Sequence, residues 1–425
     1  MGDVLIHNVK VLDATGAKPF AGAVRVRGNR IAEVIKGPVK PGNGRTDVVD
    51  GGGATLMPGL IEAHAHISFA NTPDLDSLGN IPPEEHTLLT ARHAKLMLDQ
   101  GFTACCSAAA AKPRLDIVIR NAIEAGEIPG PRLRAATPEM TVTAGLGDVR
   151  LSHLHRETFA IICDGADEFR RTSRMMVREG VDILKINPSG DEFVPHARAE
   201  RTVMTQEEVA AVCEVGRAFG KTVAAHARSA EAVKLCVKNG VTNIYHATFA
   251  DEEARDLLES KKDEVFVAPT FGVTWTTLYE ASPWGITTEI ATNLGMKREL
   301  DIGIETIKDL KKRGVKILPG GDYGFAWNPV GTDARDMEHF VKLLDYTPME
   351  AIQACCALGG EIMGMAGELG QIRKGWLADL ILVDGDPLKD IAILQDARRL
   401  SGIMKDGAFH KRPPEPRSGT QRKAA

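Results

Sequence analysis

The sequence lacks every segment that would direct it to a membrane or out of the cell. No stretch of its 425 residues approaches the roughly 20 consecutive apolar residues that a transmembrane helix needs. The N-terminus reads MGDVLIHNVKV, without the basic start, apolar core and cleavage site of a signal peptide. The ends also lack the residues that myristoylation and prenylation require. We therefore expect a cytoplasmic protein with no membrane partner.

Cysteine is scarce, and basic residues are not in excess. The seven cysteines include two adjacent pairs and no C-x-x-C, so a disulfide framework is not expected and a reducing compartment is. The 52 Lys and Arg residues stand against 57 Asp and Glu residues, which gives a formal net charge of −5. Such a balance offers no electrostatic footprint for nucleic acid. A small-molecule substrate is the leading expectation.

The composition is that of a folded chain, with 43% hydrophobic and 26% charged residues. Residues 1–58 alternate apolar and polar side chains between frequent turns, which is typical of short antiparallel strands. The same texture returns in residues 368–411. We expect the two ends to complete one small β-domain, because chain termini often lie close together. Residues 412–425 are basic and Pro-rich, and we expect a disordered tail there.

Residues 59–367 alternate short apolar runs with helical stretches. One such helix is predicted by Thr205 as its N-cap, Glu208 at the capping-box position and Gly220 as its end signal. Apolar runs between helices are typical of buried parallel strands. Eight runs are present, which predicts an α/β fold with a (β/α)₈ TIM-like barrel: LIEAHAHI, FTACCSAA, PRLRAAT, VDILKIN, TVAAHA, VTNIYHAT, VFVAPTF and VKILPGGD.

Ligand-type side chains end several of these runs, where a TIM barrel carries its active site. They are His64, His66, Lys185, His226, His246 and Asp322. Imidazole and carboxylate suit Zn²⁺ or similar divalent ions, and six groups exceed the needs of one tetrahedral catalytic ion. We therefore expect two divalent metal ions, with Zn²⁺ as the expected metal. Lysine is a poor ligand, so Lys185 fits this set only as an N6-carboxylysine; the alternative is an ion pair with acidic neighbours.

In these segments the chain resembles the amidohydrolase superfamily, and within it the imidazolonepropionase-like group of prolidase-type Xaa carboxypeptidases and ochratoxin-type amidases. The resemblance rests on ATLMPGLIEAHAHI, VDILKI, TVAAHA, VTNIYHAT, ILPGGD and GELGQIRKGWLADLILVDGDP, and it spans nearly the whole chain. It implies that carboxylated Lys185 bridges two ions, one held also by His64, His66 and Asp322, the other by His226 and His246. It also implies that the β-rich ends form a small β-sandwich.

The expected chemistry is hydrolysis of an amide-like C–N bond. Divalent ions lower the pKa of water, so that hydroxide is available as the nucleophile near neutral pH. Asp322 is expected to accept a proton and deliver it to the departing nitrogen. The expected catalytic residues are Asp322, Lys185 and His246.

The two recognition segments depart from the peptidase pattern of that group. T-G-G-H-G-D is replaced by TAGLGD, so that Leu146 stands in place of a hydrogen-bonding His; His153 and His155 are possible substitutes. H-A-Y-T is replaced by HARS, which introduces Arg228. Two residues beyond His226 on a strand, Arg228 shares its face and could clamp a substrate carboxylate. The alternative is an ion pair with an acid such as Glu231 or Asp251.

Aromatic residues make up only 5% of the chain, yet several cluster around the seventh and eighth runs. Loops in this position overhang a barrel's active face, so these residues could form an apolar wall for an aryl or bulky acyl group. The alternative is that they pack helices against the barrel. The cluster comprises Trp275, Tyr279, Trp284, Tyr323, Phe325 and Trp327.

The preferred hypothesis is a binuclear hydrolase of a hydrophobic, aryl-bearing amide. The expected substrate-binding residues are Arg228, Leu146, Tyr323, Trp275 and Trp327. A homo-oligomeric state is also expected. Ureas, carbamates or thiocarbamates are alternative substrates, which Leu146 would tolerate and Arg228 would not explain. Cyclic amides are another option. A barrel that has lost catalysis and serves as a scaffold is the alternative from a different class.

Overall fold

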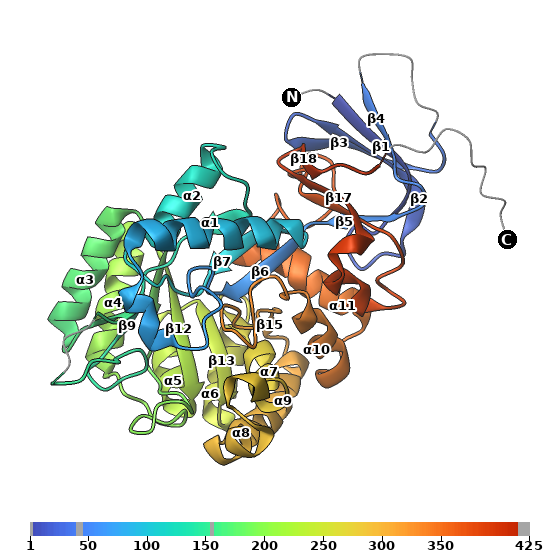
Figure 1. Ribbon diagram of the computed structural model, residues 1–425. Coiled ribbons are helices and arrows are strands. Elements are labelled where there is room, and N and C mark those ends of the chain that lie inside the picture. Colours follow the sequence, from blue (N-terminus) through green and yellow to red (C-terminus); the bar gives the residue numbers. More distant parts are fainter. Residues whose placement is uncertain (1–2, 40–45, 154–156, 415–425) are drawn as a thin grey trace.

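A computed structural model describes residues 3–39, 46–153 and 157–414 of the chain (Figure 1). The strands drawn at the two ends of the colour scale lie together at one side, and the helices surround strands in the remainder (Figure 1). Within the described residues, no helix is long and apolar enough to cross a membrane. All seven cysteines are buried and free.

Strands from both ends of the chain form one eight-stranded sheet. Its order is β18-β17-β16-β5-β1-β2-β3, and β4 pairs with β1. Ile381 of β16 lies opposite Met57 of β5 in an antiparallel register, which joins the two ends directly. The strands are β1 (Asp3–Val11), β2 (Phe20–Arg27), β3 (Arg30–Lys36), β4 (Asp47–Asp50), β5 (Thr55–Pro58), β16 (Leu380–Val383), β17 (Leu400–Lys405) and β18 (Ala408–Lys411).

Apolar residues from both ends build the core of this sheet. Ile6, Val24, Leu56 and Leu380 belong to one buried cluster, as the alternating sequence pattern predicts. Of the predicted tail, residues 412–414 are described, and Arg412 contacts Asp47 with an N···O distance of 2.6 Å. Residues 415–425 lie outside the described part.

The central region contains parallel strands in two sheets, of order β6-β7-β8 and β10-β9-β11-β12-β13-β14-β15. Each of the eight predicted runs contains a strand, and β9 and β10 are additional. Isolated parallel bridges join Ala136 to Ile183 and Ala65 to Tyr323, between segments of the two sheets. The strands are β6 (Leu60–Ala65), β7 (Phe102–Ser107), β8 (Arg132–Arg134), β9 (Glu139–Thr141), β10 (Ala160–Ile162), β11 (Ile183–Ile186), β12 (Thr222–Ser229), β13 (Asn243–Phe249), β14 (Phe266–Ala268) and β15 (Lys316–Ile317).

Helices cover these strands on the outside (Figure 1), which explains why the strands are apolar on both faces. Helix α4 has the predicted capping box between Thr205 and Glu208, and it ends at Gly220 in the left-handed conformation. The helices are α1 (Pro83–Asp99), α2 (Leu115–Glu124), α3 (Ala166–Glu179), α4 (Gln206–Phe219), α5 (Ala230–Asn239), α6 (Glu252–Ser260), α7 (Phe271–Tyr279), α8 (Thr288–Leu294), α9 (Met296–Lys312), α10 (Arg335–Leu343), α11 (Pro348–Ile352) and α12 (Gly359–Ile362).

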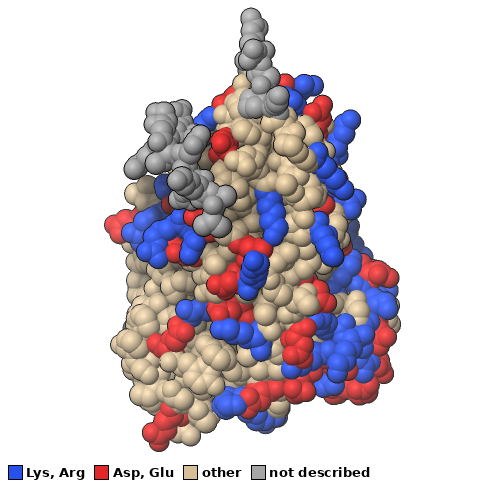
Figure 2. Space-filling model, turned by 90° about the vertical axis from the view of Figure 1, so that its right-hand side faces the viewer, with Lys and Arg blue, Asp and Glu red and all other residues tan. Residues whose placement is uncertain are grey.

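Short helical turns complete the described chain: η1 (Leu75–Asn80), η2 (Ser282–Trp284), η3 (Gln353–Leu358), η4 (Ile391–Gln395) and η5 (Ala397–Arg399). On the face drawn in Figure 2, Lys and Arg lie interspersed with Asp and Glu rather than in separate fields. That face shows the mixed charge expected from the balanced composition.

Candidate metal centre and active-site cavity

The end of β6 and the loop after β15 bring three ligand-type side chains together. The Nε2 atoms of His64 and His66 lie 3.2 and 3.0 Å from Oδ1 of Asp322. The backbone fixes this arrangement, because the Asp322 N–H donates to the His64 carbonyl and the His66 N–H donates to the Tyr323 carbonyl. His66 Nδ1 contacts the Ala109 carbonyl at 3.2 Å, which directs Nε2 toward Asp322. One metal ion could bind this buried group.

The protonation states of this group suit a metal. Burial lowers the pKa of His64 to about 4, so its imidazole is neutral at pH 7. Burial raises the pKa of Asp322, but the charges and hydrogen bonds of His64 and His66 outweigh it and hold that pKa well below its usual value. A neutral imidazole and an ionised carboxylate are the forms that coordinate divalent ions.

A second pair, His226 and His246, lies beside the first group, with ring centroids 4.2 Å apart. His226 Nε2 contacts the Gly190 carbonyl at 3.0 Å, which leaves Nδ1 as the nitrogen available to a metal. His246 Nδ1 lies 2.6 Å from the Thr270 hydroxyl. Burial, followed by the charge of Arg228, lowers both histidine pKa values well below normal. Both rings are therefore neutral.

Lys185 reaches the same cavity from β11 and is 1% exposed. Its Nζ lies 3.2 Å from Oδ1 of Asn187 and 3.5 Å from Oε1 of Glu139. Asn187 also donates to Glu139 at 2.9 Å and to the Leu146 carbonyl at 3.2 Å. The acidic neighbour of Lys185 is therefore Glu139, which the sequence reasoning missed because strand β9 was not predicted.

Several buried atoms of this group make no well-formed hydrogen bond within the described residues. They are both ring nitrogens of His64, Nε2 of His246 and Oδ1 of Asp322, although His64 Nε2 and His66 Nε2 approach that oxygen to 3.2 and 3.0 Å. Buried polar atoms without partners are rare in proteins, and here they are imidazole nitrogens and a carboxylate oxygen, the donor set of Zn²⁺. The residues fit a metal centre.

A cavity of about 400 Å³ opens above these residues, within the range typical of small-molecule sites. His64, His66, Lys185, His226 and Asp322 line it. Its walls are largely apolar and aromatic, formed by Phe69, Leu146, Phe159, Phe193, Val273, Met296, Phe325 and Trp327.

The aromatic rings connect the metal ligands to the surface. Phe69 stacks on His66 at 4.0 Å, and Phe325 lies 6.2 Å from Phe69. Trp327 lies 5.9 Å from Phe325. Trp284 and Phe193 each lie 6.3 Å from Trp327 and are 43% and 42% exposed. These contacts form a continuous aromatic wall, defined here as Phe69, Phe325, Trp327, Phe193 and Trp284.

Four of the six aromatic residues predicted for the wall are not part of the cavity lining, namely Trp275, Tyr279, Trp284 and Tyr323. Tyr323 is fully buried and donates its hydroxyl to the Asp333 carbonyl, whereas its neighbour Asp322 lines the cavity. Trp275 contacts Tyr279 and His339 instead. The cavity face of α7 is taken by Thr274 and Thr277, which are three residues apart and share one side of the helix.

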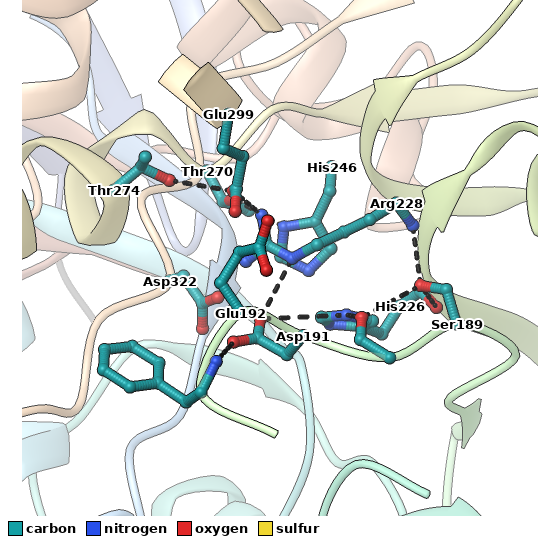
Figure 3. Close-up of polar contacts among 12 residues, drawn as sticks. Ser189, Asp191, Glu192, His226, Arg228, His246, Thr270, Thr274, Glu299 and Asp322 are labelled. Atoms are coloured by element: carbon teal, nitrogen blue, oxygen red, sulfur yellow. Dashed lines mark hydrogen bonds and ion pairs between the residues drawn. The ribbon is translucent and has the colours of Figure 1, made fainter. Parts of the chain in front are cut away.

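Arg228 lines the cavity but is only 4% exposed. Its Nε lies 3.0 Å from Oδ2 of Asp191, and its Nη1 pairs with Glu299 (Figure 3). The predicted acids Glu231 and Asp251 were wrong, because both contact Lys234 at 2.8 Å. Asp191 and Glu299 lie far from Arg228 in sequence, so no local pattern marks them.

The structure separates Leu146, which replaces the hydrogen-bonding histidine of the peptidase pattern, from His153, one of its two possible substitutes. Leu146 lines the cavity. His153 is exposed and is not among the lining residues, and His155 lies outside the described residues. His196, which was not predicted, does line the cavity. Two further histidines on α1 were not predicted; both are buried and contact the chain just after His66. His86 Nε2 lies 2.6 Å from the Ser68 carbonyl, and His93 Nδ1 lies 2.9 Å from the Ile67 carbonyl.

Comparison with known proteins gives consistent matches. Residues 55–409 match the model of the amidohydrolase family. Ochratoxinase of Aspergillus niger is 26% identical over 387 residues, covering 84% of this chain and 76% of that protein. Imidazolonepropionase of Ralstonia nicotianae is 25% identical over 410 residues, covering 91% and 92%. The solved structure of a prolidase complexed with N-methylphosphonate-L-proline is 26% identical, with a TM-score of 0.86 over 96% of this chain and 100% of that one.

Proposed function

The chain belongs to the amidohydrolase family, and we propose that within it the protein is a binuclear metal-dependent hydrolase that cleaves the amide C–N bond of a hydrophobic, aryl-bearing substrate. One observation carries the proposal: buried ligand-type side chains with unpartnered nitrogen and oxygen atoms meet at a cavity with aromatic walls. The fold positions them there because parallel strands end at one edge.

We assign one ion to His64, His66 and Asp322 and the other to His226 and His246, with carboxylated Lys185 between them and Zn²⁺ as the expected metal. The ring nitrogens left available by the Gly190 and Thr270 contacts support the second site. The burial of Lys185 beside the ligands supports its inclusion. Carboxylation would replace the ammonium that now faces Glu139 with an anion, whose charge the two ions would balance. When bound, the ions supply a Lewis acid for the substrate carbonyl and lower the pKa of water.

The chain's own residues then hold the substrate and move the proton. Asp322 is ionised, so the carboxylate oxygen that does not face His64 and His66 could accept a proton from water and deliver it to the departing nitrogen. His64, His226 and His246 stay neutral, and together with His66 they act as ligands. The aromatic wall receives the aryl group and excludes water from the reacting bond.

We further infer that the two parallel sheets close into one (β/α)₈ barrel spanning residues 59–367. The isolated bridges Ala136–Ile183 and Ala65–Tyr323 support closure at both gaps. We take residues 1–58 and 368–411 as one β-sandwich domain beside it, which the shared sheet supports.

Metal analysis combined with a substrate panel tests the proposal. Protein purified with Zn²⁺ is expected to hold two equivalents and to hydrolyse N-benzoyl anilides. Asp322→Asn is expected to lose about 10²- to 10⁴-fold in kcat, the range of one acid–base group, and Asp263→Asn in an exposed turn serves as the control. One equivalent at saturation contradicts the binuclear site, and a normal kcat in Asp322→Asn assigns the proton transfer to another group.

A further inference from the structure

We propose that the buried ion network of Arg228, Asp191 and Glu299 selects substrates whose leaving group carries no carboxylate. The inference rests on the proposed amide hydrolysis and deepens it by naming the substrate class. It makes simple amines and anilines the preferred leaving groups, rather than amino acids.

Arg228 lies beside His226, one of the assigned metal ligands, and we therefore place the substrate's leaving group near it. Arg228 follows His226 by two residues on β12, so that both side chains point to the same face. Both residues line the cavity. Its guanidinium is the only charged side chain on this strand's cavity face, and its availability decides whether a carboxylate is bound there.

Two buried carboxylates already occupy that guanidinium. Asp191 faces Nε at 3.0 Å, and Glu299 pairs with Nη1 (Figure 3). Asp191 is held in turn by the Phe193 N–H at 3.0 Å, and Glu299 lies 3.4 Å from the Thr274 hydroxyl. An arginine recognises a carboxylate best with two parallel N–H donors, and here two of its nitrogens are engaged within the protein.

Leaving aside the two proposed metal ions, the charged side chains around Arg228 also oppose a carboxylate. Glu192 is a third buried acid beside the network, and Arg198 contacts it at 2.8 Å. Two guanidinium groups therefore face three carboxylates. A substrate carboxylate would be a fourth acid in a buried site, where like charges are poorly screened.

Apart from the six expected metal ligands, the described cavity lining offers no second Arg or Lys beside Arg228, although His196, Thr274 and Thr277 supply other hydrogen-bond donors. The acidic residues in that lining are Asp74, Asp76, Glu139, Asp148 and Asp191. Leu146 presents no side-chain donor at the position where the resembling peptidases have a histidine. A neutral or basic leaving group meets no such repulsion.

A matched pair of substrates tests this. N-benzoyl-L-phenylalanine and N-benzoyl-2-phenylethylamine differ only in the carboxylate. We expect the wild-type, metal-loaded enzyme to show a kcat/KM at least 10-fold higher for the neutral compound. Glu299→Gln removes one competing charge and frees part of Arg228, so the preference is expected to shift toward the acid by about 10- to 100-fold, the range of one charge-assisted hydrogen bond.

Controls separate selectivity from folding. Glu305→Gln is a matched change on the exposed side of the same helix, α9, and is expected to keep the wild-type preference. Asp191→Asn is a second test if Glu299→Gln does not fold, and it is expected to shift the preference in the same direction. Equal or better use of the acid by the wild type overturns the inference, as does an unchanged preference in a folded network variant.

Failure of the proposed function is distinguishable from failure of this inference. If the enzyme hydrolyses neither compound, aryl amide hydrolysis is refuted, and calorimetric binding of the same two compounds decides the inference. Tighter binding of N-benzoyl-2-phenylethylamine supports it. Equal or tighter binding of the acid, or binding of neither compound, overturns it.

Discussion

Thr270 should control metal affinity without being a ligand. Its side chain is fully buried, and its hydroxyl lies 2.6 Å from Nδ1 of His246. This contact orients the imidazole and leaves Nε2 for a metal. Thr270→Val keeps the shape and the branching at Cβ but removes the hydroxyl, so it isolates the hydrogen bond.

The expected loss follows from the single contact. Removing the group that orients a metal-bound histidine weakens metal binding by about 10- to 100-fold, which corresponds to about 1.4–2.8 kcal/mol. The unpartnered Nδ1 left behind costs a similar amount, about 1–3 kcal/mol. We therefore expect roughly a 30-fold weaker second ion, with the first ion at His64, His66 and Asp322 unaffected.

Competition with a chromogenic zinc chelator measures the two affinities separately. Thr276→Val is the matched control, because Thr276 is also fully buried and its hydroxyl donates to the Gly272 carbonyl at 2.8 Å, away from the ligands. Unchanged affinity in Thr270→Val would refute the reasoning. An equal loss in Thr276→Val would show that the effect comes from general destabilisation.

Three further predictions concern the bridge, the cavity wall and a buried acid. Lys185→Ala should abolish activity, and added short-chain carboxylic acids should restore part of it by filling the vacated site; full activity in the variant would remove Lys185 from the ligand set. Trp327→Ala should lower the ratio of kcat/KM for aryl over alkyl amides by about 5- to 10-fold, whereas Trp275→Ala, outside the cavity, should leave that ratio unchanged. Burial raises the pKa of Asp333 to about 7. The stabilisation that its protonated carboxyl gives the folded chain is therefore full below the pKa of Asp in the unfolded chain, and it is lost as the pH rises toward 7. Asp333→Asn should therefore gain about 2 kcal/mol in unfolding free energy relative to wild type between pH 5 and pH 7, and an unchanged difference between the two proteins at both pH values would contradict this.

The strands and the ligand-type residues could be predicted because their signals are local. Several of the short apolar runs carry His, Lys or Asp at or near their ends. Because parallel strands of a barrel end at one edge, the predicted fold brings His64, Lys185 and His226 to one place. The capping box of α4 is likewise a local signal, because its two residues, Thr205 and Glu208, lie within four positions of the sequence. These features need no knowledge of distant contacts.

The partners of the charged residues could not be predicted in the same way. Glu139 faces Lys185 from a strand of three residues, too short for an alternating pattern to appear. Glu299 reaches Arg228 from α9, 71 positions away, whereas the predicted partners Glu231 and Asp251 were chosen for being near in sequence. Nearness in sequence is a poor guide to ion pairs between different βα units, because the fold and not the chain order sets which helix covers which strand.

The backbone shows why the centre itself departs from local rules. His246, Thr270 and Asp322 have positive φ angles of 73°, 62° and 60°, which are uncommon for residues other than glycine and least favourable for a β-branched residue such as Thr270. Such conformations persist only where the surroundings fix them, and the backbone bonds between β6 and residues 322–323 do so for Asp322. Local preference disfavours these conformations at the very residues that meet at the cavity. The strain therefore marks the same site that the unpartnered nitrogen and oxygen atoms mark, and the two observations are independent of each other.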